Sequence, residues 1–151
     1  MITKKAKYAI KAMIYLSKKK KGEHALITDI SDAEHIPKKF LEAILLDLRK
    51  AGYLGSKKGK GGGYALAKPP REIMMGQVIR ILEGPLAPVS CVSESAYKPC
   101  DDCQDEESCG IRLVMKDVRD AIANVLDRKS LQDVINQKQH FLEKKSVIAS
   151  T

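Results

Sequence analysis

The residues best suited to chemistry are four cysteines that all lie in one short stretch. They stand at Cys91, Cys100, Cys103 and Cys109, in the spacing C-x8-C-x2-C-x5-C. The residues between them are mostly polar and acidic, a composition that disfavours both a packed strand and an amphipathic helix. Deprotonated thiols are strong ligands for soft metal ions. We therefore expect this stretch to be a loop whose cysteines bind a metal that orders it.

Composition indicates the compartment in which these thiols act. A chain of 151 residues with 44% hydrophobic residues can form one domain, or one domain with an appendage. Charged residues interrupt every apolar run, and the N-terminus lacks the apolar core of a signal peptide, so we expect a cytoplasmic protein without a membrane partner. In a reducing cytosol, clustered cysteines serve as metal ligands or redox sensors more often than as disulfides.

The charge of the chain is strongly uneven. Residues 1–70 carry sixteen Lys and Arg against six Asp and Glu, whereas residues 71–151 carry eleven against thirteen. A basic N-terminal half beside a nearly neutral second half suggests a module that binds a polyanion, because each cation placed on a phosphate releases a counterion. A solvated lysine surface is the alternative that charge alone leaves open.

Three helices are expected before residue 52. Residues 3–17 have apolar residues at helical spacing, with Thr3 as the N-cap. A second helix over 26–36 is expected to stop at Pro37, and a third, over 38–51, to turn Phe40 and its apolar neighbours inward. Two short helices joined by a tight turn form a helix-turn-helix, whose second helix would enter the major groove of DNA with Lys38 and Lys39.

A basic hairpin is expected next, with strands near 53–56 and 64–67. Its tip contains three lysines and four glycines in seven residues. Glycine lets a backbone approach a phosphate chain closely and Lys58 and Lys60 supply charge, so the hairpin resembles the wing of a winged helix-turn-helix. A nucleotide-binding loop is the competing interpretation, but the G-x-x-x-x-G-K-[ST] pattern is missing; an inert turn is the other.

The second half is expected to begin with a short helix over 74–82 and, after the cysteines, to continue with a long helix to about residue 127. One face of the long helix is an apolar stripe, which we expect to pair with the same helix of a second chain. The stripe comprises Ile111, Val114, Val118, Ala121, Ile122 and Val125. A short last helix is expected to start at Ser130, and the polar tail to be flexible.

These elements predict a mainly α-helical fold with a small β-hairpin wing: a winged helix-turn-helix followed by a long dimerisation helix. The expected parts are a DNA-binding domain (1–83), a cysteine-rich loop (84–109), the dimerisation helix with a short final helix (110–135), and a tail (136–151). A dimer would present two recognition helices to a palindromic site on double-stranded DNA.

Several segments together resemble the IscR/NsrR-type bacterial regulators, winged-helix dimers of which many carry an iron-sulfur cluster. The resemblance covers residues 1 to about 135. It rests on Tyr8-Ala9, on the sequence PKKFLE over 37–42, on AGYL over 51–54, on the wing residues from Ser56 to Ala67, and on Cys109 at the start of the long helix.

This resemblance implies roles for particular residues. It implies that the first three helices and the wing bind DNA, that the long helix dimerises, and that cysteines near its start hold the cluster. With the lysines already named, the full set of residues expected to bind DNA is Lys38, Lys39, Glu42, Ser56, Lys57, Lys58, Lys60, Gly61 and Tyr64. Glu42 could accept a hydrogen bond from a cytosine amino group, or be a solvated helix charge. Lys58 stands where the family usually has arginine, so minor-groove readout is expected to be weaker.

The cysteine spacing departs from the family's common C-x5-C-x5-C form. Cys91 and Cys109 match the outer cysteines, and either Cys100 or Cys103 could be the middle one. Family members take a non-cysteine fourth ligand from positions occupied here by Arg112, Tyr8 or Ala12, none of which is suitable. Four thiolates are the usual ligands of a [2Fe-2S] or [4Fe-4S] cluster, so we expect all four cysteines to bind, with [2Fe-2S] favoured. Zinc is the alternative metal.

The sequence thus predicts a homodimeric transcriptional regulator, not an enzyme, that senses iron-sulfur status, redox change or nitric oxide through its cluster. Two alternatives remain open. One is a zinc-stapled protein that binds nucleic acid or another partner through its basic face; the other is a cluster-free regulator that answers to a small molecule or a partner protein.

Overall fold

Six α-helices and one β-hairpin make up residues 2–150, the part of the chain that the structure, a computed structural model, describes. The expected mainly helical fold with a small hairpin is confirmed. The elements are α1 (Lys4–Ser17), α2 (Ile27–Glu34), α3 (Lys38–Lys50), β1 (Leu54–Lys57), β2 (Gly63–Leu66), the 3-10 turn η1 (Pro70–Glu72), α4 (Met75–Glu83), the 3-10 turn η2 (Ser90–Val92), α5 (Gly110–Leu126) and α6 (Leu131–Ala149).

Helix α1 is the centre of the core. Its side chains Ala6, Ala9, Ala12 and Met13 are fully buried, and the helix contacts α2, α3, α4, β2 and α6. Three alanines on the buried face leave room for so many neighbours to pack closely. The helix begins as expected, because the Thr3 hydroxyl accepts a hydrogen bond from the Lys5 amide over 3.1 Å.

A carboxylate from α4 also holds the start of α1. Glu83 Oε1 accepts hydrogen bonds from the Thr3 hydroxyl, from the Thr3 amide at 3.3 Å and from the Ala6 amide at 3.2 Å. The hydrogen bond with Thr3 is the main cause of the lowered pKa of Glu83. A negative charge at a helix N-terminus satisfies free amides and complements the helix dipole, so this residue fastens α4 to α1.

The helix-turn-helix differs from expectation at its turn. Helix α2 ends because His35 adopts a left-handed conformation, φ 53°, two residues before Pro37, which serves instead as the N-cap of α3. Leu41 and Ile44 on α3 are fully buried as expected, but the inward orientation expected for Phe40 is wrong. This ring is 47% exposed, on the flank of α3 that faces α1, and its centroid lies 5.9 Å from that of Tyr8 in an edge-to-face contact.

The last helix is longer than expected, and its first residue is buried in the core. Leu131 is fully buried in the main core, and its amide donates to the Ile73 carbonyl over 2.8 Å. The boundary expected at residue 83 therefore does not divide the core. The expected short final helix is also wrong, because α6 continues to Ala149, through the segment expected to be a tail. The capping box of Ser130 with Asp133 starts it, and no glycine or proline follows to stop it.

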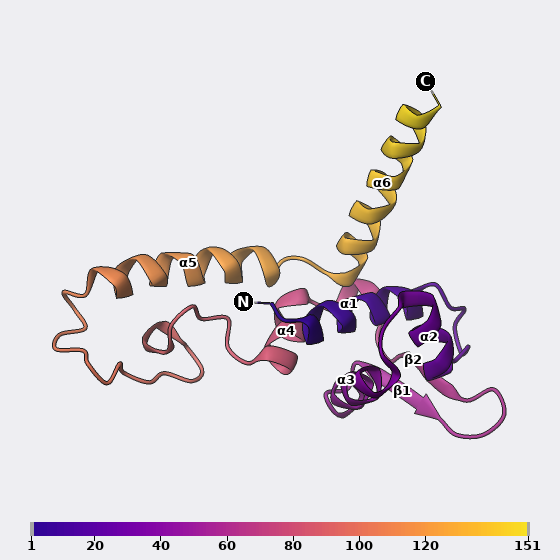
Figure 1. Ribbon diagram of the computed structural model, residues 1–151, viewed down its shortest axis with the longest axis horizontal. Coiled ribbons are helices and arrows are strands. Elements are labelled where there is room, and N and C mark those ends of the chain that lie inside the picture. Colours follow the sequence, from indigo (N-terminus) through magenta and orange to yellow (C-terminus); the bar gives the residue numbers. More distant parts are fainter. Residues whose placement is uncertain (1, 151) are drawn as a thin grey trace.

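Helix α5 extends away from this core (Figure 1). The cysteine loop runs out beneath it and returns to its N-terminus, while α6 leaves the core in a different direction. No helix within residues 2–150 is long and apolar enough to cross a membrane.

Candidate nucleic-acid interface and cysteine centre

The first turn of α3 is exposed, as a recognition helix requires. Lys38 and Lys39 are its first two residues, Glu42 follows one turn later, and all three lie on the surface. On the α1 side, Lys5 Nζ lies 2.8 Å from the Asp47 carboxylate and links the two helices. The helix is therefore fixed by a buried apolar face while its basic N-terminal turn projects outward.

The hairpin is tied to the end of the same helix. Strands β1 and β2 pair antiparallel with Ser56 opposite Tyr64 and Lys57 opposite Gly63. Arg49, in the last turn of α3, donates from Nη1 to the Ser56 hydroxyl over 3.0 Å. Arg49 is exposed, and the sequence carried no signal for this role. Because it spans from the helix to the strand, it fixes the hairpin relative to α3.

The four glycines of the hairpin tip serve two different purposes. A Cβ at Gly62 would overlap the Lys57 carbonyl oxygen, and one at Gly63 would overlap that of Ala25, so the fold itself requires these two glycines. Gly59 and Gly61 have positive φ but open space around them. Both are exposed, so their backbone can approach a phosphate chain.

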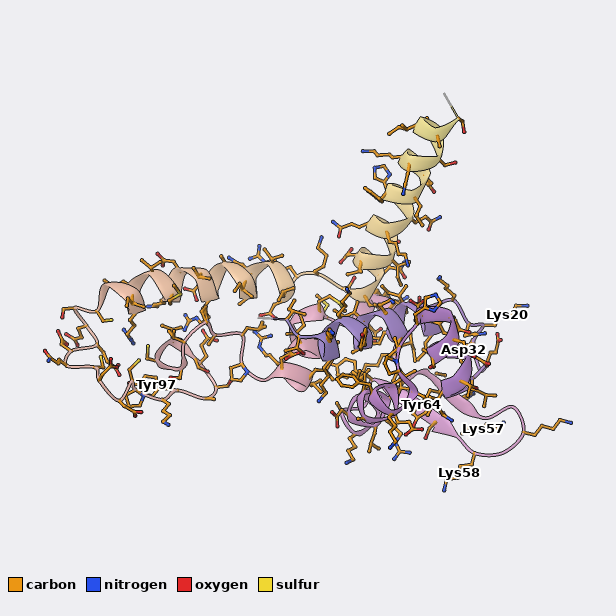
Figure 2. The ribbon with its side chains drawn as sticks, in the orientation of Figure 1. Lys20, Asp32, Lys57, Lys58, Tyr64 and Tyr97 are labelled. Atoms are coloured by element: carbon orange, nitrogen blue, oxygen red, sulfur yellow. The ribbon has the colours of Figure 1, made fainter. Side chains whose placement is uncertain are left out.

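Tyr64 combines an interface position with a structural one. Its amide and carbonyl exchange two hydrogen bonds with Ala25, each 2.8 Å long, and its half-buried side chain packs against the core. It lies between α3 and the lysines of the tip in Figure 2. The expected contact with DNA can involve only the exposed part of this ring.

Two groups of lysines lie at opposite ends of the hairpin. Lys58 and Lys60 are exposed at the tip. The Ala25–Tyr64 bridge is antiparallel, so the chain before Ala25 leads toward the other end of β2, where residues 19–23 and 65–70 line one cavity. Figure 2 shows Lys20 well away from Lys58. A duplex seated on the tip and on α3 would therefore meet the first group and not the second.

The cysteines differ in exposure. Cys91 is 6% exposed within η2, Cys103 and Cys109 are half-buried, and Cys100 is exposed. The Cys91 and Cys100 thiols are in hydrogen-bond contact, which is the main cause of the raised pKa of Cys100. Desolvation, followed by the nearby Cys109 charge, raises the pKa of Cys103. The loop thus gathers the sulfurs into one neighbourhood, which disfavours the thiolate forms of Cys100 and Cys103.

The joint ligand set expected from the sequence is only partly formed. Within residues 2–150, no three Cys, His, Asp or Glu side chains meet in an arrangement ready to hold a metal ion. The donor chemistry nevertheless fits an iron-sulfur cluster or zinc, because all four side chains are thiols and Cys91 lies near Cys100. A shared site then requires the loop to bring Cys103 and Cys109 to the Cys91–Cys100 pair.

The outer part of the loop is linked to the start of α5. Cys109 is the N-cap residue of this helix. The Tyr97 hydroxyl donates to the Glu106 carboxylate, whose other oxygen lies 3.7 Å from Nε of Arg112 in the first turn of α5. Closure of the loop around a metal would therefore act directly on the helix N-terminus.

The apolar stripe of α5 remains uncovered within the described chain. None of its residues is buried, and the large ones range from 36% exposed at Ile122 to 67% at Ile111. The expected members Val114, Val118, Ala121 and Val125 are exposed as well.

The far end of α5 is fastened to α4, which packs against α1 and α3. Arg80 on α4 binds both oxygens of the Asp127 carboxylate, over 2.5 and 2.9 Å, and the pKa of Asp127 is lowered chiefly by this pair. Gly76 makes the approach possible, since a Cβ there would overlap Asp127 Oδ1. Helix α5 therefore joins the cysteine loop at one end and α4 at the other.

Comparison with known proteins agrees with this arrangement. The Rrf2 family profile, described as "Iron-dependent Transcriptional regulator", matches residues 2–137. A Rhodobacter capsulatus protein named as an rrf2-like HTH-type regulator is 44% identical over 138 residues, 89% of this chain and 92% of that protein. The HTH-type transcriptional regulator NsrR of Bacillus licheniformis is 32% identical over 93% of this chain and 95% of its own.

Solved structures of similar fold include two regulators. CymR, described as the global cysteine regulator of B. subtilis, superposes with a TM-score of 0.73 at 31% identity, over 91% of this chain and 97% of its own. The IscR of T. potens has a TM-score of 0.71 at 28% identity, over 91% and 88% of the two chains.

Proposed function

The chain belongs to the Rrf2 family of transcriptional regulators, and we propose that it acts in the cytoplasm as a homodimer on a palindromic DNA operator, under the control of an iron-sulfur cluster. The cluster would be held by Cys91, Cys100, Cys103 and Cys109. Its signal would be iron-sulfur status, redox change or nitric oxide.

Binding of DNA by α3 and the wing is supported by exposure and charge. Lys38 and Lys39 project from the first turn of α3 and Glu42 from the next, and Lys57, Lys58 and Lys60 surround the hairpin tip. Lysines on the hairpin tip can neutralise phosphates, whereas the exposed N-terminal turn of α3 can reach the edges of the bases. Ser56 would support the wing through Arg49, and Gly61 would contribute backbone amides to the same interface.

Dimerisation through α5 is supported by its uncovered apolar face. Six residues, Ile111, Val114, Val118, Ala121, Ile122 and Val125, lie exposed on one helix. A second copy of α5 carries the same residues and would cover them in a two-fold arrangement. The stripe directly follows Cys109, so a change in the cysteine loop would reach the interface and, through it, the spacing of two recognition helices.

The single observation that carries the proposal is the placement of all four thiols in a loop joined to the first residue of α5. An iron-sulfur cluster would supply a group that is lost or changes charge on oxidation or reaction with nitric oxide. To switch DNA binding, it must differ in stability between the two arrangements of the helix pair.

Metal and sulfide analysis of protein purified without oxygen tests the proposal. We expect iron and acid-labile sulfide in equal amounts, a brown colour, and loss of both in each of the four single Cys→Ser variants. A colourless chain with one zinc ion per subunit would replace the cluster by a structural zinc site. Footprinting then separates a regulator, which protects a palindrome, from a protein that binds any duplex equally.

A regulator without a cluster is the second candidate, favoured by the superposition on CymR at a TM-score of 0.73. In this case the four cysteines would remain free thiols, or the loop that carries them would form part of a surface that binds a partner. Wild-type operator binding that is unaffected by all four Cys→Ser substitutions together would select this candidate.

A further inference from the structure

Arg119 of α5 contacts both the cysteine loop and its own helix neighbour Asp120. Only 15% of its side chain is exposed. Its Nη1 donates to the Val92 carbonyl oxygen over 2.7 Å, and its Nη2 lies 3.7 Å from the Glu94 carboxylate. The neighbouring Asp120 accepts from Nε over 2.8 Å. The guanidinium therefore joins the middle of α5 to a turn twenty-seven residues earlier in the chain.

The turn that it holds is the one that contains Cys91. Cys91, Val92 and Ser93 are 6%, 4% and 7% exposed, and the Val92 and Ser93 amides close the 3-10 turn η2 on the two residues before Cys91. This small buried patch lies outside the main core cluster and packs on α5. The carbonyl bound by Arg119 belongs to the residue directly after Cys91. A rotation of the Cys91 backbone must therefore move the acceptor of the Arg119 bond.

We propose that Arg119 is the positioning residue that transmits the state of Cys91 to α5, an inference that rests on the proposed function. Binding of a metal fixes the direction of the Cys91 Sγ atom, and because Cys91 lies in a short buried turn, any accompanying change in its backbone also moves the Val92 carbonyl. When the Val92 carbonyl moves, either α5 shifts with it or the charge-assisted hydrogen bond from Arg119 is lost at a site largely shielded from solvent. The two arrangements of α5 thereby acquire different free energies.

The geometry of the side chain explains why an arginine serves here. Its planar fork binds a carbonyl with one nitrogen and a carboxylate with two others at the same time, so it is fixed in orientation. An ammonium group could satisfy only part of this set. Arg119 is consequently held in one orientation and links α5 to the η2 turn; we refer to this link as the strut.

Three measurements on the full-length chain test the inference, with Arg119→Leu as the disrupting variant. Leucine has the volume to fill the half-buried site. Arg128→Leu, at an exposed arginine just beyond α5, removes the same charge as a control. The first measurement is the alkylation rate of Cys91 by iodoacetamide in metal-free protein, read by mass spectrometry after cleavage at Glu83 and Glu94. The second is amide hydrogen exchange in that same segment, which does not depend on thiol protonation.

The third measurement compares two affinities for the same DNA duplex: that of the chain reconstituted with iron and sulfide, and that of the metal-free chain. The duplex is first selected from random sequences with the wild-type protein, and the result is expressed as the ratio of the two affinities. We expect Arg119→Leu to speed Cys91 alkylation and amide exchange roughly tenfold, as loss of one charge-assisted hydrogen bond implies. We also expect the affinity ratio to fall toward one while the iron content stays that of the wild type. Arg128→Leu should leave all three at their wild-type values.

The outcomes separate the inference from the function on which it rests. Unchanged alkylation and exchange in Arg119→Leu would overturn the strut, whatever metal the loop holds. Faster alkylation with an unchanged affinity ratio would show that the strut holds the turn but transmits nothing, which overturns the coupling. A wild-type ratio of one would overturn the proposed function and the coupling with it, and the first two measurements would still decide whether Arg119 holds η2.

Discussion

The two lysine groups of the hairpin allow a sharp test of how this chain binds DNA. The tip variant replaces Lys58 and Lys60 by alanine. The base variant replaces Lys20 and Lys21, at the opposite end of the hairpin. Both remove the same charge from exposed positions in the same half of the chain. Any difference between them must therefore come from where the lysines lie.

The expected magnitude follows from counterion release. Each lysine taken off a phosphate reduces the slope of log affinity against log salt by about 0.9. A dimer carries each substitution twice, so the tip variant should lower the slope by about 3 to 4 if both lysines contact phosphate. The base lysines act only across solvent, where charges separated by more than about 8–10 Å are largely screened at physiological salt. We expect the base variant to change the slope by less than about 1.

The assay is equilibrium binding to the selected duplex by fluorescence anisotropy, repeated over a series of salt concentrations. Circular dichroism of each variant confirms that the fold is retained. Equal slopes for the tip and base variants would refute the assignment of the hairpin as a wing. That result would instead favour a basic surface that binds polyanions without a defined geometry.

Three further predictions concern stability and assembly. Glu83→Gln should lower the free energy of unfolding by about 1 kcal/mol at neutral pH, a value reduced for solvent exposure. Because the folded-state pKa of Glu83 is lowered, this stabilisation is complete above the carboxyl's unfolded pKa and disappears as pH falls through the folded value, so thermal unfolding of variant and wild type should converge in acid. Val118→Glu should weaken the dimer at least about a hundredfold in sedimentation equilibrium, whereas Asn124→Glu elsewhere on α5 should not; equal effects would argue against the stripe as the interface. Gly63→Ala should cost more than about 2 kcal/mol in urea unfolding, since its φ is 125° and its Cβ meets a carbonyl; an equal loss in Gly55→Ala, where space is open, would contradict this explanation.

Much of the fold could be predicted from local sequence. The periodicity of α1, α3 and α5, the Thr3 cap and the glycine-rich turn each act within a few residues of one another, so their signals are contained in short windows. The exposed stripe of α5 and the exposed first turn of α3 followed from the same reasoning. Phe40 was misjudged because a residue on the flank of a helix is inside or outside according to its neighbour, here Tyr8 on α1.

The last helix shows a different limit. The capping box at Ser130 was recognised, yet the polar composition after 136 was taken to indicate a tail. Helix propensity without a breaker was the better guide, since no glycine or proline lies within α6. The burial of Leu131 beside Ile73 had no signal in either segment alone.

The sequence by itself determined the chemistry that this chain can perform: four thiols in one loop, a basic N-terminal half and an apolar face on the helix that follows. Tertiary structure alone decided which residues from distant parts of the chain contact one another. Glu83 reaches Thr3 across eighty residues, Arg80 reaches Asp127 across forty-seven, and Arg119 reaches Val92 across twenty-seven. The physical reason is that residue type and spacing set what a side chain can bind, whereas contacts between distant segments depend on how whole helices pack, which no short window of sequence contains.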